Sequence, residues 1–446
     1  MEITSLVSGG NGLATLPDGM VVFVSETVPG DRASIRLTKR KNHYAQAQLI
    51  SLLEPSPDRC APACPHAGDC GGCKWQMIRY ETQLHAKEQI LAGAFQHLGG
   101  FRDSLPLLPI MGAPDPLHYR NKMEFSFGGN LDQLTLGLHY SGSWAGVFDT
   151  TGCLLGPAPM MDFLGLIRSR AQELKLISYH NIKHTGTLRF AIIRYSWSRD
   201  EWLLTLITTD QQPCEVEQLL DYLAGQLPKN LSLVHGISLN YAAIATADRY
   251  RTITGAGFIR ENLNNIQFQI GPQTFFQSNP LQAEHLFNRA MELAELNSQD
   301  RVLELFCGVG AISLIMASHV ESVCGVEMVE ASVQMAEENC KRQGIANCRF
   351  IQADVGKLSP TLFDTNFTTV VVDPPRPGVP PSAIQLIHRI APVKIIYISC
   401  NPDTLARDAS FICQGGRYRL AALQPVDMFP QTPHIESIAL FHRVSA

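Results

Sequence analysis

Residues 301–327 constrain the fold most, because two short apolar strands flank a glycine turn within them. The first strand runs into the turn 306–310 (FCGVG), a helical stretch follows, and the second strand ends in Glu327. A strand, a glycine turn, a helix and a strand that ends in an acid together hold a nucleoside, with the acid on the ribose hydroxyls. Only two glycines of the three in a dinucleotide fingerprint are present, which favours a cofactor without a pyrophosphate.

Two further strands continue this pattern toward the C-terminus. One ends in Asp354, a carboxylate that could meet an adenine, and the next ends in Asp373-Pro-Pro-Arg376. The two prolines fix the backbone beside the Asp373 carboxylate. Ligands of α/β sheets bind outside the carboxyl ends of the strands, so we expect both acids at one edge of one sheet.

A thiol and another acid are expected at the same edge. The stretch 394–402 (KIIYISCNP) is typical of a short, buried, β-branched strand that ends at a proline. Cys400 then lies at the carboxyl end of a strand, where a thiol is a candidate nucleophile. Glu436 begins a later apolar strand. Its spacing leaves open the alternative that it is a solvent-facing charge.

Five of the twelve cysteines lie before residue 160, and four of them are close together. In a cytosolic chain such a cluster more often binds metal than forms disulfides. Thiolates select zinc or iron–sulfur, and zinc sites usually pair two short Cys-x-x-Cys units, whereas only one is present here. Its cysteines are Cys70 and Cys73, with Cys64 upstream. The fourth ligand is either Cys60 or the distant Cys153. The spacing is not that of radical enzymes that cleave S-adenosylmethionine.

Residues 1–56 contain short strands at about ten-residue spacing, which suggests a small barrel. The stretch 36–44 (RLTKRKNHY) gathers four cations and a tyrosine, a composition suited to phosphates and bases. The alternative is a solvated hairpin tip. The segment resembles a TRAM domain, an OB-like RNA-binding module, and this resemblance favours an RNA contact.

The net charge of −5 and the absence of a long apolar run set the wider expectations. We expect a cytoplasmic protein with no membrane contact and no obligate protein partner, in which any nucleic-acid binding uses a local basic patch. The middle of the chain predicts a helix over 80–98 and paired strands near 188–195 and 202–208. Three cations of this region are expected to be ordinary exposed charges: Arg189, Arg194 and Arg199.

Taken together, these motifs resemble the uracil-C5 RNA methyltransferase family over essentially the whole chain. The most specific of them are Ser-Cys-Asn-Pro at 399–402 and Thr-x-His-x-Glu at 432–436. The resemblance implies S-adenosylmethionine as cofactor and a 4Fe-4S cluster on Cys64, Cys70, Cys73 and Cys153, with Cys60 as the spare cysteine. It implies cofactor contacts from Gln277, Phe306, Glu327, Asp354 and Asp373. Relatives often carry Asn where this chain has Ala311, which lacks a polar side chain for that contact.

The implied chemistry explains the residue types. C5 of uracil is a poor nucleophile until a thiolate adds to C6, and Cys400 is the expected thiolate. Glu436 is the expected base that removes the C5 proton after methyl transfer, and Asp373 is expected to orient the uracil or the methyl donor. The target base must leave its stack, so loops and single-stranded RNA are the expected substrates.

The expected architecture is a multidomain α/β protein. It consists of a TRAM β-barrel over 1–56, a central α+β RNA-binding domain with the cluster over 57–272, and a Rossmann-like class I methyltransferase domain over 273–446. The helix at 80–98 is a candidate to pack on the catalytic domain. The expected substrate is 23S ribosomal RNA. The alternatives are transfer RNA with the same chemistry, or a non-catalytic iron–sulfur RNA-binding protein.

Overall fold

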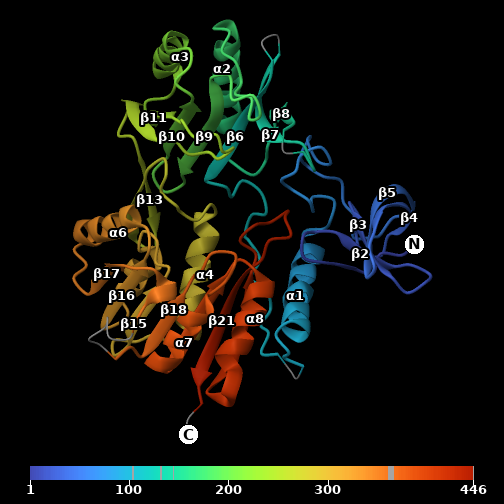
Figure 1. The fold of residues 1–446 in the computed structure, drawn as a ribbon, viewed down its shortest axis with the longest axis vertical. Coiled ribbons are helices and arrows are strands. Elements are labelled where there is room, and N and C mark those ends of the chain that lie inside the picture. Colours follow the sequence, from blue (N-terminus) through green and yellow to red (C-terminus); the bar gives the residue numbers. More distant parts are fainter. Residues whose placement is uncertain (103–104, 131–132, 144, 360–365, 445–446) are drawn as a thin grey trace. The chain divides into compact units, whose positions relative to one another are not determined.

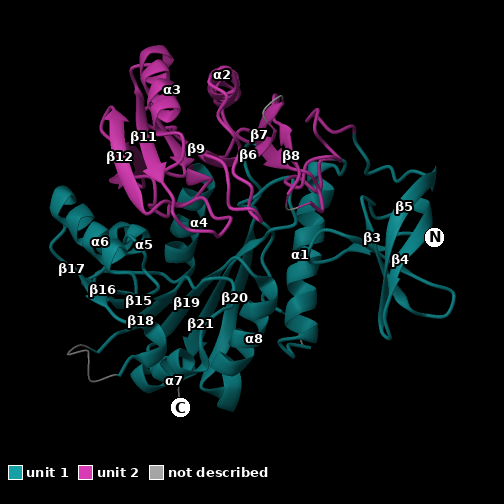
Figure 2. Cartoon of the chain, turned by 45° about the horizontal axis from the view of Figure 1, so that its top comes forward, with its two compact units in different colours: residues 1–60, 77–116, 281–446 teal, residues 61–76, 117–280 magenta. Residues whose placement is uncertain are grey.

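The structure, a computed structural model, describes residues 1–102, 105–130, 133–143, 145–359 and 366–444. The chain divides into two compact units, which Figure 2 distinguishes by colour. Unit 1 comprises 1–60, 77–116 and 281–446, and unit 2 comprises 61–76 and 117–280. The three domain boundaries expected from the sequence stay a prediction. No helix in these described ranges is long and apolar enough to cross a membrane.

The N-terminal part of unit 1 is a five-stranded sheet with the order β1-β2-β3-β5-β4. Alternate residues of β2 and β3 are buried and form a small core with Ile3, Ala45 and Ala47. The basic stretch 36–44 forms the end of the hairpin between β4 and β5, where Arg40 pairs with Asp18. The strands are β1 (Ser5–Leu6), β2 (Gly12–Thr15), β3 (Val21–Ser25), β4 (Arg32–Arg40) and β5 (Tyr44–Glu54).

The C-terminal part of unit 1 is a seven-stranded sheet with the order β17-β16-β15-β18-β19-β21-β20 (Figure 1). The first five strands in this order are parallel, and β21 runs antiparallel to both of its neighbours. The chain builds outward from β15 to β17 and then returns to β18, so the strand order reverses between β15 and β18, where α/β sheets bind ligands. The strands are β15 (Arg301–Leu305), β16 (Ser322–Glu327), β17 (Cys348–Gln352), β18 (Thr369–Val372), β19 (Lys394–Ser399), β20 (Tyr418–Val426) and β21 (Glu436–Arg443).

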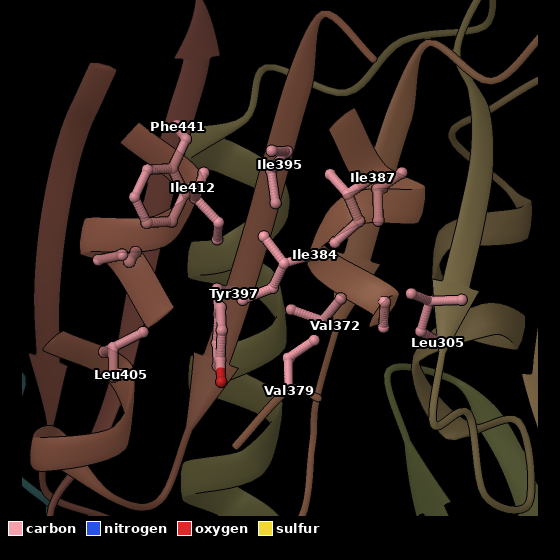
Figure 3. Close-up of a cluster of buried hydrophobic side chains, with 14 of the residues drawn as sticks. Leu305, Val372, Val379, Ile384, Ile387, Ile395, Tyr397, Leu405, Ile412 and Phe441 are labelled. Carbon is pink, nitrogen blue, oxygen red and sulfur yellow. The ribbon is translucent and has the colours of Figure 1, made fainter. Parts of the chain in front are cut away.

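Helices cover this sheet because the central strands are apolar on both faces. Figure 3 shows the core on one face, which includes Leu305, Tyr397 and Phe441. Leu91, Ala94 and Phe95 of α1 belong to the same core, so the helix expected at 80–98 does pack on this sheet. The helices of this part are α1 (Tyr80–His97), α4 (Pro280–Leu293), α5 (Ala311–Ala317), α6 (Glu330–Gln343), α7 (Pro381–Ile390) and α8 (Pro402–Cys413).

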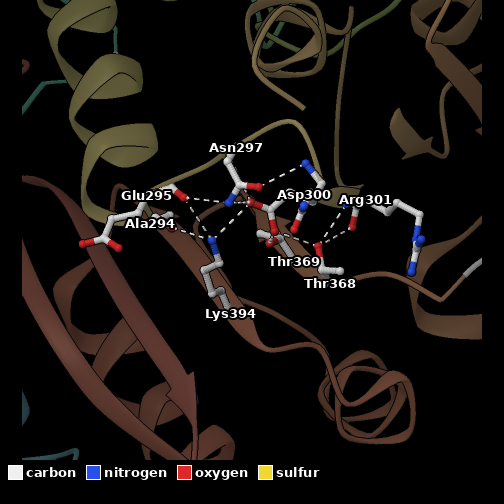
Figure 4. A network of polar contacts seen from close by, with 9 residues as sticks. Ala294, Glu295, Asn297, Asp300, Arg301, Thr368, Thr369 and Lys394 are labelled. Atoms are coloured by element: carbon white, nitrogen blue, oxygen red, sulfur yellow. Dashed lines mark hydrogen bonds and ion pairs between the residues drawn. The ribbon is translucent and has the colours of Figure 1, made fainter. Parts of the chain in front are cut away.

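A buried polar network ties together the amino ends of the central strands (Figure 4). Lys394, the first residue of β19, pairs with Asp300 at 3.2 Å and donates to the carbonyl of Ala294 at 2.7 Å. Asp300 also accepts hydrogen bonds from the hydroxyls of Thr368 and Thr369. This network lies at the edge opposite the strand ends that carry the predicted site residues, so it serves stability.

Unit 2 is built on a mixed seven-stranded sheet with the order β12-β11-β10-β9-β6-β7-β8. The strands are β6 (Lys122–Gly129), β7 (Leu134–His139), β8 (Val147–Asp149), β9 (Leu188–Ser196), β10 (Glu201–Thr208), β11 (Leu231–Ile237) and β12 (Arg249–Thr254). A separate hairpin and two helices complete the unit: β13 (Ile259–Leu263), β14 (Ile266–Ile270), α2 (Pro159–Glu173) and α3 (Pro213–Gln226).

The expectation that the arginines of β9 are exposed is wrong for two of them. Arg189 and Arg194 are each only 3% exposed. The Arg189 guanidinium donates to Ser238 Oγ at 2.8 Å and lies 4.5 Å from the centre of the Tyr179 ring. Arg194 donates to the carbonyl of Thr274 at 2.6 Å. Both cations are therefore structural, because loops distant in sequence cover them and accept hydrogen bonds from their terminal guanidinium nitrogens.

Candidate active site

Three predicted catalytic residues meet at one edge of the C-terminal sheet. Asp373 follows the last residue of β18, Cys400 follows the last residue of β19, and Glu436 is the first residue of β21. Ser399 pairs with Ser437 in the antiparallel β19–β21 ladder, so the next position along it sets Cys400 beside Glu436. The sheet register thus brings together residues that are far apart in sequence.

Burial raises the pKa of both carboxyl groups at this edge. The pKa of Asp373 rises from its ordinary value to about 7 because its carboxyl is removed from water. The pKa of Glu436 rises well above 4.5, first through burial and then through the nearby Asp373 carboxylate, while Arg376 lowers it. Glu436 is not the solvent-facing charge that the sequence left open, since it is only 6% exposed.

Cys400 is half-buried beside these acids, and its thiol is held in the neutral form. Its pKa is raised to about 11, first by burial and then by the charges of Glu436 and Asp373, whereas Arg376 acts to lower it. The resting thiol is therefore a weak nucleophile, and it becomes a thiolate when a base takes its proton or when positive charge arrives.

Arg376 is a site residue that the predictions left without a role, although the Asp-Pro-Pro-Arg motif contains it. Its guanidinium is the cation that lowers the pKa of both Cys400 and Glu436. One of its nitrogens lies 3.5 Å from Nδ1 of His434. The side chain is exposed, so it can reach a ligand at the sheet edge.

The residues after Cys400 hold the backbone around Arg376 in place. The side-chain amide of Asn401 and the hydroxyl of Thr404 both donate to the Arg376 carbonyl, at 3.1 and 3.3 Å. Arg407 donates to the carbonyl of Pro377 at 2.8 Å. These contacts give Asn401, Thr404 and Arg407 a common role, which is to hold the backbone of residues 376–377.

Asp408 also joins the segment after Cys400 to the loop after β18. Its buried carboxylate accepts hydrogen bonds from the backbone N–H of Val379 at 2.8 Å and from the hydroxyl of Tyr397 at 2.7 Å. Gly378 has a φ of +86°, and a Cβ at this position would lie 2.5 Å from the Asp408 carboxylate. Only glycine fits this close approach, so the loop 373–379 and the segment 399–408 form one rigid wall.

The glycine turn after β15 is hydrogen-bonded to the acid at the end of β16. Phe306 has a φ of +66°, a strained conformation for a non-glycine residue, at the point where β15 enters the glycine turn. Glu327 accepts hydrogen bonds from the N–H of Gly308 at 3.1 Å and from those of Met328 and Val329 at 2.9 Å. These bonds fix the carboxylate beside the turn, as required of a group that binds ribose hydroxyls.

Asp354 and Gln277 are the other cofactor contacts that the sequence predicts in this family. Asp354 follows β17 by one residue, accepts a hydrogen bond from Gly356 N–H at 2.9 Å and pairs with Lys357 at 3.3 Å. These contacts lower its pKa. Gln277 belongs to unit 2, where its carbonyl accepts a hydrogen bond from the Asn121 amide at 3.1 Å.

Glu304 is a buried acid in the middle of β15 that the predictions did not include. It is 1% exposed and its carboxylate accepts a hydrogen bond from the Ser313 hydroxyl. Burial raises its pKa to about 8, with further contributions from Asp373 and Glu327. An acid inside an apolar strand is the signal that could have identified it.

Four cysteines of unit 2 line one small cavity: Cys64, Cys70, Cys73 and Cys153. The backbone N–H groups of His66 and Gly72 donate to the sulfurs of Cys64 and Cys70, each at 3.4 Å. Burial and the neighbouring thiols raise the pKa of Cys73 to about 12. Cys60 is exposed and does not line this cavity.

Burial first, and then the neighbouring thiols, raise the pKa of Cys70, Cys73 and Cys153, so these cysteines lie near one another. Across the described part of the chain, no three His, Cys, Asp or Glu side chains converge on a point where they could bind a single metal ion. The arrangement thus lacks the geometry of a zinc site with tetrahedral thiolates.

Comparison with known proteins identifies relatives along the whole chain. Residues 226–444 match the family model described as tRNA (uracil-5-)-methyltransferase, and residues 2–50 match the TRAM domain. A protein of Chlorobaculum tepidum named as an uncharacterized RNA methyltransferase is 37% identical over 96% of this chain and 92% of its own length. One of Thermosynechococcus vestitus with the same description is 34% identical over 99% of this chain and 97% of its own length.

A solved structure matches the fold over the same extent. It is that of the Pyrococcus abyssi tRNA (uracil-54, C5)-methyltransferase in complex with S-adenosyl-L-homocysteine. The TM-score is 0.79 at 25% sequence identity, and the match covers 99% of both chains. The C-terminal sheet therefore has the Rossmann-like methyltransferase fold, and a TRAM domain precedes it.

Proposed function

The chain belongs to the uracil-C5 RNA methyltransferase family and is a methyltransferase that acts on RNA with S-adenosylmethionine, and we propose that it methylates C5 of a uridine in 23S ribosomal RNA through a covalent Cys400 adduct. The observation that carries this proposal is the register that sets Cys400, Asp373 and Glu436 at one sheet edge. A TRAM domain and a four-cysteine cavity together favour the ribosomal substrate.

The first step activates the uracil. Cys400 loses its proton to water, so that Glu436 keeps a free carboxylate for the second step, where its raised pKa makes it a stronger base than an ordinary glutamate. The thiolate then forms a bond to C6, and the electron pair of the C5–C6 double bond moves toward O4 as an enolate. Arg376 provides positive charge near the thiolate.

The second step forms the product. S-adenosylmethionine supplies an electrophilic methyl group when it is bound. C5 of the enolate would take this methyl group as the donor's sulfur–methyl bond breaks and S-adenosylhomocysteine leaves, so that C5 then carries both the methyl group and a proton. Glu436 removes the C5 proton, the C5–C6 double bond returns, and the C6–sulfur bond breaks to release Cys400.

The residues that would hold the cofactor fit a nucleoside. Glu327, fixed by three backbone N–H groups, would bind the ribose hydroxyls, and Asp354 would accept from the adenine amine. Phe306 at the glycine turn and Gln277 would contact the methionine part, and Asp373 would orient the uracil or the donor.

The test uses RNA in which 5-fluorouridine replaces uridine. Fluorine at C5 cannot be removed as a proton, so we expect the enzyme to stop as a covalent adduct that survives a denaturing gel. Fragments of 23S RNA and transfer RNA are compared, each with S-adenosylmethionine. An adduct on 23S RNA alone supports the proposal. An adduct on transfer RNA alone would show that transfer RNA, and not 23S RNA, is the substrate. No adduct on either RNA by a protein that binds the cofactor would support the non-catalytic alternative.

Transfer RNA is the second candidate substrate because of one specific observation. The Pyrococcus abyssi enzyme, which matches over 99% of the chain, is named for uracil 54 of tRNA. The chemistry is the same for both RNAs, and only the surface that grips the substrate would differ.

We further propose that Cys64, Cys70, Cys73 and Cys153 bind a 4Fe-4S cluster. A cluster takes one thiolate on each of its four irons, and these four cysteines line one cavity. The N–H groups that point at Cys64 and Cys70 resemble those that tune cluster thiolates.

The ligand set predicts opposite results for two cysteine variants. We expect anaerobically purified protein to contain roughly four irons per chain, as the Cys₄ ligation of such clusters requires. Cys153→Ala should lose most of this iron and its visible absorption. Cys60→Ala, the matched control at an exposed cysteine, should keep both. Iron loss in Cys60→Ala alone would make Cys60, and not Cys153, the fourth ligand. Zinc in place of iron would exclude the 4Fe-4S cluster.

A further inference from the structure

Helix α1 carries a buried lysine that the mechanism does not use. Lys87 is 0% exposed, and its ammonium donates to Asp427 Oδ1 at 2.5 Å and to the carbonyl of Phe429 at 3.2 Å. Burial lowers the pKa of Lys87, and Asp427 opposes this effect. The hydroxyl of Tyr80, also on α1, donates to the second oxygen of Asp427 at 2.9 Å. Because the cost of burying two charges offsets much of their attraction, stability alone does not account for this ion pair.

A second contact from the same helix holds the next part of this segment. The Gln83 side chain donates to Gln431 Oε1 at 3.0 Å and accepts from the Gln431 backbone N–H at 3.1 Å. Gln431 has a φ of +67°, which is strained for a residue other than glycine. Strain of this kind persists only where the surroundings enforce it, and Gln83 supplies that constraint.

The segment held by α1 leads directly to Glu436. Val426, the last residue of β20, is the ladder partner of Glu436, and Asp427 is the next residue. The chain then turns through 428–435 and enters β21 at Glu436. Lys87 and Gln83 thus bind both the beginning and the middle of the segment that joins β20 to β21.

We propose that Lys87 and Gln83 are positioning residues that fix the segment 427–435, so that the Glu436 carboxylate reaches the C5 proton after methyl transfer. The inference rests on the proposed function, because it assigns α1 to the step in which Glu436 is the base. A proton transfer requires heavy atoms within about 3 Å, and a small displacement of the segment would slow this step more than the earlier ones.

The two stages can be measured separately. The rate of adduct formation on 5-fluorouridine RNA reports thiolate addition and methyl transfer only. Release of tritium from RNA labelled at C5 of ordinary uridine reports proton removal. We expect Gln83→Leu and Lys87→Met to form the fluorinated adduct at near the wild-type rate. Tritium release should fall about tenfold or more, within the range of a general base, and the adduct on ordinary uridine should accumulate.

The matched control is Lys394→Met, which breaks an ion pair of the same sheet at the opposite edge. It should lower the midpoint of thermal unfolding and leave the ratio of the two rates unchanged. Gln83→Leu leaves no buried charge behind, so it decides the question if Lys87→Met does not fold. Parallel slowing of both rates in Gln83→Leu, or no change in either, would overturn the inference.

The proposed function fails in a different way. In that case the wild-type protein forms no adduct on fluorinated RNA, or Glu436→Gln does not trap an adduct on ordinary uridine. Either result would show that Glu436 is not the base of this reaction. The role inferred for α1 in positioning Glu436 would then be excluded as well.

Discussion

Cys400→Ala is expected to bind S-adenosylmethionine and RNA but to form neither the fluorinated adduct nor the methylated product. Without the thiolate, C5 stays a poor nucleophile, and no other group at this edge can replace the sulfur. We expect turnover to fall by on the order of 10⁴-fold or more, since loss of the nucleophile in another covalent enzyme costs about 10⁶ in kcat. Single-turnover transfer of labelled methyl groups measures this effect.

The structure provides a matched control for this substitution. Cys413, at the end of α8, is also a half-buried thiol whose pKa burial raises to about 11. Cys413→Ala removes a thiol of similar environment away from the sheet edge, so it should retain activity. Residual methyl transfer by Cys400→Ala above the background without enzyme would exclude Cys400 as the nucleophile.

The candidate site could be predicted from the sequence where local pattern decides position. An apolar β-branched run followed by Cys-Asn-Pro fixes where a strand ends, and Cys400 does follow the last residue of β19. The same argument located Asp373 after β18 and Glu327 at the end of β16. Parallel strands of one sheet end at one edge, so these positions needed no knowledge of tertiary contacts.

Features that depend on long-range pairing were not predictable in this way. The spacing of Glu436 alone left open a solvent-facing charge, the family resemblance named it as the base, and only the antiparallel ladder with β19 sets it beside Cys400. Lys87 lies 340 residues from Asp427 and has the appearance of an ordinary helical lysine in the sequence. Arg189 and Arg194 have the appearance of ordinary exposed charges in the sequence, yet other segments cover them. In each case the partner is supplied by the fold.

Glu436→Gln is expected to trap the methylated adduct on ordinary, non-fluorinated uridine. Glutamine cannot accept a proton, so thiolate addition and methyl transfer can proceed while elimination of Cys400 stops. We expect release of C5 tritium to fall by about 10² to 10⁴, the usual contribution of a general base. A denaturing gel should then show a protein–RNA band that the wild type does not accumulate. If Glu436 also takes the thiol proton, adduct formation itself should be slower at low pH.

The fold should tolerate this substitution, because the carboxyl is already unfavourable in its charged form. The folded pKa of Glu436 lies well above the ordinary value of 4.5. The stabilising effect of its bound proton is fully present below the unfolded pKa and is lost as pH rises through the folded pKa. Glutamine has no such dependence. We therefore expect Glu436→Gln to unfold at the same temperature as the wild type or higher at pH 7, with the difference closing below pH 4.5.

Glu304→Gln is the control for Glu436→Gln. It removes a buried carboxyl group that is not expected to act as the base. Glu304 is likewise buried with a raised pKa, but its carboxylate accepts a hydrogen bond from Ser313 of helix α5. Its replacement should change adduct formation and tritium release together, without a trapped band on ordinary uridine. If Glu436→Gln releases tritium as fast as the wild type, proton removal belongs to another group, and Asp373, with a pKa of about 7 at the same edge, becomes the next candidate.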